Sequence, residues 1–166
     1  MFDPALIAQA ERLLARCRSL GLRLSCAESC TGGLLTALLT EIPGASEVVE
    51  RAFVTYSNRA KVELLGVREE SLARHGAVSE RVAREMAEGA LARSDAHIAL
   101  AITGIAGPGG GSPEKPVGLV HIAGARGPLT LHRRHRFSGD RTAVRLEAVG
   151  AALALVDELL TERDLA

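Results

Sequence analysis

Short apolar segments with the composition of buried strands alternate with helical segments along this chain. Three strand-like segments lie at 22–27 (LRLSCA), 52–56 (AFVTY) and 96–103 (AHIALAIT), and each is followed by a helical segment or a glycine-rich loop. Strands that are joined through helices favour parallel neighbours, so this alternation predicts an α/β fold. The helical segments predicted from apolar spacing are 4–20, 34–39, 58–66, 79–92 and 140–160, with a helical turn at 71–75.

A predicted hairpin interrupts the alternation near the C-terminal end. Segments 118–125 and 129–137 flank Arg126-Gly127-Pro128, which is typical of a turn between two paired strands. A hairpin adds one antiparallel strand to the sheet. We therefore predict a three-layer α/β/α sandwich with a mixed, mostly parallel sheet, and we expect residues 1–166 to form a single domain.

Residues typical of helix ends support these boundaries. Asp3, Ser79 and Asp140 each precede a predicted helix and can accept hydrogen bonds from the amides of its first turn. Pro4 fits the first turn of the first helix, and Gly21 ends that helix.

Composition excludes several classes of function. Lys plus Arg is 20 and Asp plus Glu is 20, so the chain has no basic excess for binding nucleic acid or an anionic membrane. No apolar run reaches the roughly 18 residues of a membrane helix, and the first ten residues lack the pattern of a signal peptide. Cys17, Cys26 and Cys30 lack metal-ligand spacing, as do the histidines. We expect reduced thiols, a cytoplasmic protein and no metal site.

The first candidate for chemistry is Ser29-Cys30-Thr31-Gly32-Gly33, which joins a predicted buried strand to a helix. Free backbone amides at a helix start form a site for an anion or an oxyanion, and glycines allow close approach of a ligand. In the alternative interpretation, Ser29 or Thr31 only caps the helix and the glycines ease packing. Spacing alone leaves both interpretations open.

Lys61 is the second candidate, because this chain uses arginine for nearly all of its positive charge. Among the 20 basic residues, only Lys61 and Lys115 are lysines. A buried lysine can lose its proton and act as a general base, whereas an arginine cannot. A solvated lysine on a helix surface is the alternative, and this feature alone does not decide between them.

The third candidate is the glycine-rich loop 104–116, whose length is typical of a functional loop. Its amides could hold a phosphate, although a strand rather than a helix follows it, which excludes a dinucleotide-binding fingerprint. Arg141 and Arg145 share one face of the last helix and could bind a phosphate together. A surface ion pair with Glu147 is the alternative.

Taken together, these segments resemble the CinA C-terminal domain family, also called the PncC-type nicotinamide-nucleotide amidohydrolases. The resemblance runs from about Leu6 to Leu160. It is carried by AESCTGG (27–33), YSN (56–58), Lys61, LGV (65–67), HGAVS (75–79), TGIAGP (103–108), PEKPVG (113–118) and GDR (139–141).

The resemblance implies a three-layer α/β/α fold, a homo-oligomer and an enzyme of pyridine-nucleotide salvage. The implied reaction converts nicotinamide mononucleotide to nicotinate mononucleotide and ammonia, with no cofactor. It also implies the stand-alone form, because 166 residues leave no room for the molybdopterin-binding-like domain that often precedes this one in the family.

The resemblance also assigns roles to particular residues. The family's nucleophilic serine matches Ser29, its dyad lysine matches Lys61, and its tyrosine matches Tyr56. In the implied mechanism, Lys61 takes the proton of Ser29 and later passes it to the departing ammonia, while Tyr56 relays protons or holds the lysine. The residues expected to bind the substrate are Cys30, Thr31, Gly32, Thr103, Gly104, Gly107, Arg141 and Arg145.

Two alternatives remain at this point. The thiol of Cys30 adjoins Ser29 and could act as the nucleophile with a lysine base. The chain could also be a non-catalytic module that binds a nucleotide or a partner protein. Release of ammonia from nicotinamide mononucleotide distinguishes an enzyme from such a module.

Overall fold

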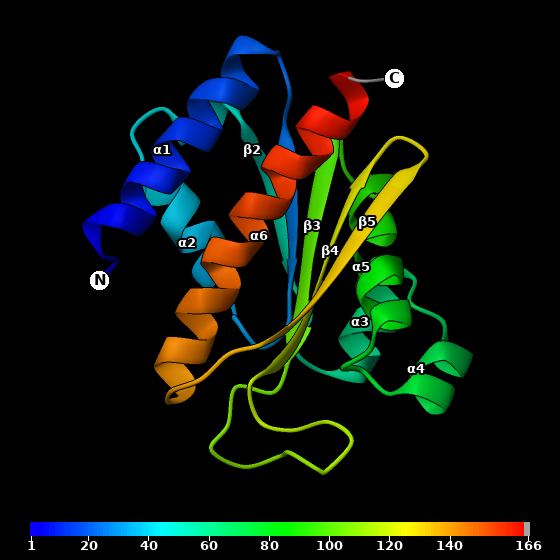
Figure 1. The fold of residues 1–166 in the computed structure, drawn as a ribbon. Coiled ribbons are helices and arrows are strands. Elements are labelled where there is room, and N and C mark those ends of the chain that lie inside the picture. Colours follow the sequence, from blue (N-terminus) through cyan, green and yellow to red (C-terminus); the bar gives the residue numbers. More distant parts are fainter. Residues whose placement is uncertain (165–166) are drawn as a thin grey trace.

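The computed structural model describes residues 1–164, which form a five-stranded sheet with helices on both faces (Figure 1). The strands are β1 (Leu24–Glu28), β2 (Val49–Val54), β3 (Ile98–Gly104), β4 (Leu119–Arg126) and β5 (Leu129–Arg136). The helices are α1 (Pro4–Ser19), α2 (Leu34–Glu41), α3 (Asn58–Leu65), α4 (Glu69–His75), α5 (Glu80–Ala92) and α6 (Arg141–Asp164), with a 3₁₀ turn at Ala45–Glu47. Helices α1, α2 and α6 cover one face of the sheet, and α3, α4 and α5 lie on the other.

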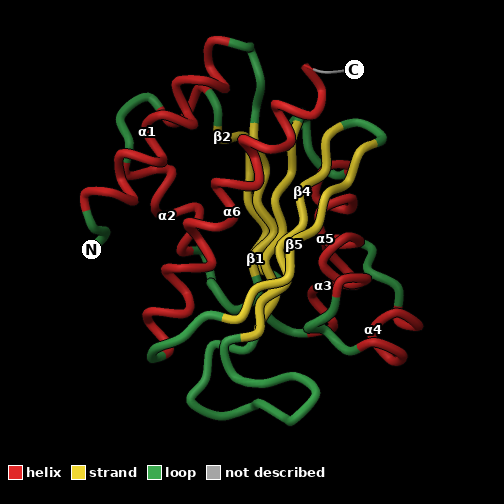
Figure 2. The backbone as a smooth tube through the Cα atoms, viewed as in Figure 1, coloured by secondary structure: helices red, strands yellow, loops and turns green. Residues whose placement is uncertain are grey.

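The strand order is β2-β1-β3-β4-β5. Both β2 and β3 pair with β1 in parallel, whereas β4 is antiparallel to β3 and to β5. Strand β4 is therefore the one strand that runs against the others, and the predicted α/β/α sandwich with a mixed sheet is confirmed. The loop 105–118 projects from one end of the sheet (Figure 2). Within residues 1–164, no helix has both the length and the apolar character needed to cross a membrane.

The alternation of side chains in β3 explains why the two faces differ. Ile98, Leu100 and Ile102 are fully buried and belong to the apolar cluster that includes side chains of α1, α2 and α6. Ala99 and Ala101 point to the other face and belong to the cluster that includes α5. Because alanines are small, α5 packs closely against the middle of the sheet.

The predicted helix starts at Asp3, Ser79 and Asp140 are confirmed by hydrogen bonds from first-turn amides to their side chains. Strand β2 differs from its prediction, because it covers 49–54 rather than 52–56. The reason is that the carbonyls of Thr55 and Tyr56 bind the amine of Lys61, so the chain leaves the sheet after Val54. Helix α4 is longer than the turn expected at 71–75.

Helix α5 also contacts α3, the helix that carries Lys61. A Cβ atom at Gly89 of α5 would lie 1.9 Å from the carbonyl oxygen of Leu65, which is the last residue of α3. Only glycine fits this close approach. Since Leu65 lies one turn after Lys61, this contact fixes the position of the helix that holds the lysine.

We predict that Gly89→Ala lowers the free energy of unfolding by about 1–3 kcal/mol, because overpacking forces α3 and α5 apart. The matched control is Gly150→Ala in α6, where the nearest heavy atom, Cδ1 of Leu6, would be 3.4 Å from the new Cβ. That variant gains helix propensity and should be neutral or stabilised by up to about 1 kcal/mol. Urea unfolding measures both, and equal effects would contradict the close approach.

Candidate active site

Ser29 and Lys61 meet at the edge of the sheet where β1, β2 and β3 end. The amide of Ser29 donates to the carbonyl of Ile102 at 3.0 Å, which extends the β1–β3 pairing one residue beyond β1. Lys61 lies in α3, which follows β2. Because the carboxyl ends of parallel strands meet at one edge, the topology brings these two residues together although they are 32 positions apart.

The amine of Lys61 is buried and has three hydrogen-bond partners. The residue is 1% exposed, and its Nζ lies 2.9 Å from Oγ of Ser29, 2.7 Å from the carbonyl of Thr55 and 3.1 Å from that of Tyr56. Carbonyl oxygens can only accept. When the amine is neutral, its two hydrogens therefore satisfy the carbonyls and its lone pair faces the hydroxyl of Ser29. This is the geometry required of a general base.

Burial lowers the pKa of Lys61 to about 8, because the ammonium form loses its hydration. The neighbouring thiol of Cys30 acts in the opposite sense and raises this pKa. With a pKa near 8, about a tenth of the lysine is neutral at pH 7 and about half at pH 8. Lys61 is therefore able to accept a proton at neutral pH, and the alternative of a solvated surface lysine is wrong.

The buried carboxylate of Glu28 holds the start of α2. Its Oε1 accepts from the amide of Leu35 at 2.9 Å, and its Oε2 accepts from the amide and the hydroxyl of Thr36 at 3.1 and 2.7 Å. Helix α2 starts after Gly33, and the residue at its N-cap position has no side chain that could accept from the first-turn amides. Glu28 does the capping instead, so the interpretation in which Ser29 or Thr31 caps this helix is wrong. A negative charge is also stabilised at a helix N-terminus.

The amides of the turn between β1 and α2 differ in whether a ligand can reach them. Gly32 has a φ of +56° and donates its amide to the carbonyl of Ser29 at 3.1 Å. Its amide is thus occupied, which corrects the expectation that it binds an oxyanion. Thr31 is fully buried and does not line the cavity beside Ser29, which corrects the expectation that it binds the substrate. Within residues 1–164, the amide of Cys30 has no acceptor outside its own side chain, so it remains as the candidate oxyanion donor beside Ser29.

Cys30 is a weaker nucleophile candidate than Ser29. Burial raises the pKa of its thiol to about 11, so the thiolate is scarce at neutral pH. The positive charges of Arg145 and Lys61 lower this pKa by less than burial raises it. The hydroxyl of Ser29, in contrast, is in direct contact with the Lys61 amine.

A cavity of about 280 Å³ opens beside Ser29 and Lys61. One wall is the glycine-rich loop, including Gly104 and Gly107, and another is the segment Ala77–Val78 before α5. Thr103 also lines it, but its hydroxyl donates to the carbonyl of Ala77 at 2.9 Å. This bond joins the end of β3 to the opposite wall. The lining residues are Ser29, Cys30, Tyr56, Lys61, Ala77, Val78, Thr103, Gly104, Ile105, Ala106, Gly107, Gly109, Gly110 and Arg141.

Arg141 and Tyr56 lie together at this cavity. Arg141 donates to the carbonyl of Gly107 at 2.7 Å and to the phenol oxygen of Tyr56 at 3.2 Å. Tyr56 is 62% exposed, and it binds Lys61 through its backbone carbonyl. The structure therefore places the phenol of Tyr56 against an arginine, and the predicted hold on the lysine is made by the tyrosine backbone.

Arg145 occupies a different place from the one expected. Its Nε donates to the carbonyl of Cys30 at 3.1 Å and its Nη2 to the carbonyl of Thr31 at 2.9 Å. It does not line the cavity. The expectation that Arg145 joins Arg141 in binding a substrate phosphate is therefore corrected, because its guanidinium is bound to the backbone of the turn.

The capping role of Glu28 is not predicted from the sequence. The signal is a glutamate at the end of a buried strand, followed by a helix without a local capping side chain. Glu28 and Leu35 are seven positions apart, whereas capping patterns span about three residues. Within the described residues, no group of three or more His, Cys, Asp or Glu side chains is placed to hold a metal ion.

Known proteins are similar to this chain over nearly its whole length. The family model of the CinA C-terminal domain matches residues 7–160. The chain is 52% identical over 155 residues to the nicotinamide-nucleotide amidohydrolase PncC of Escherichia coli K12. This match covers 92% of this chain and 93% of that relative. The crystal structure of the competence/damage inducible protein CihA from Agrobacterium tumefaciens has a TM-score of 0.94 and 50% identity, and the match covers 96% of this chain and 98% of that one.

Other relatives are much longer than this chain. A CinA-like protein of Syntrophobacter fumaroxidans is 54% identical over 147 residues, which is 89% of this chain but 35% of that relative. The chain thus spans about a third of the length of that relative.

We predict that Glu28→Ala lowers the free energy of unfolding by about 3 kcal/mol or more, because it leaves two amides and one hydroxyl of α2 without a charged acceptor. Glu41→Ala at the exposed end of the same helix is the matched control and should change stability by less than about 0.5 kcal/mol. Urea unfolding gives both values. Similar small losses in the two variants would show that the carboxylate of Glu28 does not stabilise α2.

Proposed function

Because this chain belongs to the CinA C-terminal domain family, we propose that it hydrolyses the carboxamide of nicotinamide mononucleotide to nicotinate mononucleotide and ammonia. The E. coli relative, which it covers almost completely, is named a nicotinamide-nucleotide amidohydrolase. The observation that carries the proposal is the contact of the buried Lys61 amine with the hydroxyl of Ser29 and two carbonyls. Such a reaction belongs to the salvage of pyridine nucleotides.

In the first step, the neutral amine of Lys61 takes the proton of Ser29 while Oγ attacks the amide carbon. The carbonyl oxygen gains a negative charge in the tetrahedral intermediate. The amide of Cys30, a residue that lines the cavity, is the donor that supports stabilisation of this charge. Because Lys61 is then an ammonium bound to two carbonyls, its third N–H faces the reacting centre.

In the second step, that N–H donates its proton to the substrate nitrogen, the C–N bond breaks and ammonia leaves. An ester between Ser29 and the nicotinate acyl group remains. Water then attacks this ester, with Lys61 again accepting the proton, and the C–O bond to Ser29 breaks as Lys61 returns the proton to the serine. Each proton thus passes through one lysine.

The cavity supports binding of an anionic nucleotide. Arg141 contributes positive charge, and no acidic residue is among those that line it. Arg141 is exposed, and its present partners are the carbonyl of Gly107 and the phenol of Tyr56. We assign the 5′-phosphate to Arg141, with amides of the glycine-rich loop as further donors.

Three further expectations belong to the same proposal. Residues 1–166 act as a single unit of this family, several copies assemble as a homo-oligomer, and the protein works in the cytoplasm. The free thiols of Cys17, Cys26 and Cys30 support a reducing compartment.

We predict that Ser29→Ala reduces ammonia release from nicotinamide mononucleotide by several orders of magnitude, because it removes the nucleophile. Ser25→Ala is the matched control, since Ser25 is a buried serine of β1 whose hydroxyl has no partner within the described residues. It should keep normal activity, and Cys30→Ala should keep most of it. If Ser29→Ala is active and Cys30→Ala is inactive, the thiol of Cys30 is the nucleophile. A wild-type protein that binds the nucleotide but releases no ammonia would be a binding module.

We predict that kcat/KM rises with pH through a midpoint near 8, because the lowered pKa of Lys61 makes the active neutral amine dominant above that value. Lys61→Arg should be nearly inactive at every pH from 6 to 9, since arginine stays protonated. Lys115→Arg, at the other lysine, should keep the wild-type profile, because arginine can still donate to the carbonyl of His75. A near-normal rate for Lys61→Arg would exclude a Ser-Lys mechanism.

A further inference from the structure

We infer that Arg145 is a positioning residue, which holds the turn after β1 so that the hydroxyl of Ser29 stays against the amine of Lys61 at the cavity. The inference rests on the proposed amidase function. It concerns a residue that touches neither the cavity nor Lys61, but binds the backbone beside the nucleophile.

The contacts of Arg145 lie on one side of the turn. Arg145 is partly buried on α6, and its Nε and Nη2 bind two consecutive carbonyls, those of Cys30 and Thr31. Two neighbouring N–H groups of one planar guanidinium thus hold two neighbouring peptide groups. A Cβ on Gly32 would lie 3.7 Å from Nη2, so the arginine packs directly against the turn.

Because each peptide group is planar, a contact that fixes its carbonyl also fixes the direction of its N–H group. In a trans peptide, the C=O and the following N–H point in opposite directions. Holding the Cys30 carbonyl toward α6 therefore turns the Thr31 amide away from α6. The same rule turns the Gly32 amide away from Arg145, where it donates to the carbonyl of Ser29. This bond closes the turn on the carbonyl of the nucleophile, so Arg145 and the Gly32 amide together fix the backbone of Ser29.

The charge of Arg145 adds to this effect. A hydrogen bond from a cation to a carbonyl polarises the whole peptide group and makes its N–H a stronger donor. The bond to the Thr31 carbonyl polarises the peptide between Thr31 and Gly32 in this way, which strengthens the bond from the Gly32 amide to the carbonyl of Ser29. A lysine at this position would supply charge, but its single nitrogen lacks the planar fork that matches two carbonyls.

The two arginines of α6 therefore have different tasks, although they are four residues apart. Arg141 lines the cavity and contacts Gly107 and Tyr56. Arg145 lies one turn further along α6, where it meets the turn after β1. An experiment that separates binding of the phosphate from the chemical step can therefore separate the two residues.

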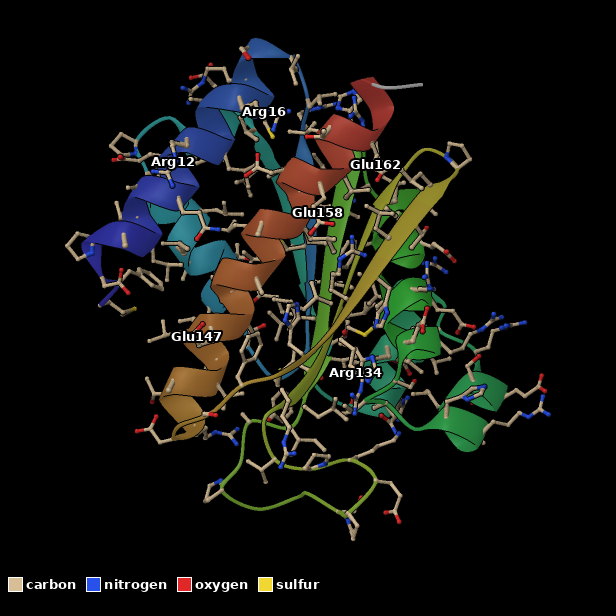
Figure 3. The ribbon with its side chains drawn as sticks, in the orientation of Figure 1. Arg12, Arg16, Arg134, Glu147, Glu158 and Glu162 are labelled. Carbon is tan, nitrogen blue, oxygen red and sulfur yellow. The ribbon has the colours of Figure 1, made fainter. Side chains whose placement is uncertain are left out.

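The experiment compares nicotinamide mononucleotide with nicotinamide riboside, which lacks the 5′-phosphate. The variants are Arg145→Lys, Arg145→Gln and Arg141→Ala. The control is Arg12→Lys, at an exposed arginine of α1 (Figure 3). Ammonia release gives kcat and KM for each pair, and thermal unfolding reports on the fold.

Both Arg145 variants should lower kcat by about 10–100-fold, because a small displacement of the nucleophile from its reactive geometry slows the chemical step. Their KM should stay within about twofold, and the loss should be equal for both substrates. The pH midpoint should not move, because Lys61 stays buried against the carbonyls of Thr55 and Tyr56. Arg141→Ala should instead lower kcat/KM for the nucleotide and leave the riboside unchanged. Arg12→Lys should match the wild type.

If the Arg145 variants raise KM for the nucleotide but not for the riboside, the inference is overturned and Arg145 binds the phosphate instead. An unchanged kcat in a folded Arg145→Lys or Arg145→Gln protein would also overturn it. If Arg145→Gln fails to fold, Arg145→Lys carries the test.

Hydrolysis of p-nitrophenyl acetate separates this inference from the proposed function. This ester also passes through an oxyanion but has neither a nucleotide nor a phosphate. A wild-type protein that cleaves the ester but not the nucleotide would contradict the proposed substrate. A lower ester rate in Arg145→Lys would then still support the positioning role, whereas an unchanged rate would overturn it.

Discussion

The site depends on one interaction, the burial of the Lys61 amine against two backbone carbonyls and the hydroxyl of Ser29. An ammonium loses much of its hydration when it is buried, so the neutral form becomes accessible near neutral pH. The carbonyls of Thr55 and Tyr56 make this burial possible, because they satisfy two N–H groups in either protonation state. Both carbonyls lie directly after β2, which ends at Val54. The boundary of β2 and the chemistry of Lys61 are thus the same feature.

Glu28 shows why this lysine can stay neutral. A buried carboxylate in direct contact with Lys61 would stabilise the ammonium and raise its pKa. Glu28 is fully buried and directly precedes Ser29, but its carboxylate oxygens accept three hydrogen bonds from the first turn of α2. The helix N-terminus therefore stabilises the carboxylate, and backbone carbonyls accept from the amine. Each buried group is satisfied by backbone or by a hydroxyl, and the two do not neutralise each other as an ion pair.

Much of this arrangement is predictable from the sequence, and the remainder has a physical reason. Alternating apolar segments indicate the layers, and the rarity of lysine makes Lys61 stand out, because both signals are local or compositional. The cap formed by Glu28 and the backbone contacts of Arg145 join residues seven and more than a hundred positions apart. Such contacts depend on how α2 and α6 pack on the sheet. Helical spacing predicts that Arg141 and Arg145 share one face of α6. It does not predict which groups each of the two guanidiniums contacts.

The start of α6 explains how one helix face serves two tasks. Asp140 caps this helix, so Arg141 is its first residue and lies at the cavity wall beside Gly107. Four residues advance the helix by about 6 Å, which is enough to bring Arg145 level with the turn after β1. Val144 and Ala148 are fully buried in the core on the same helix. They anchor α6 against the sheet, so the packing of the core sets the distance of both guanidinium groups from Ser29. A shift of α6 along its axis would disturb recognition and chemistry together.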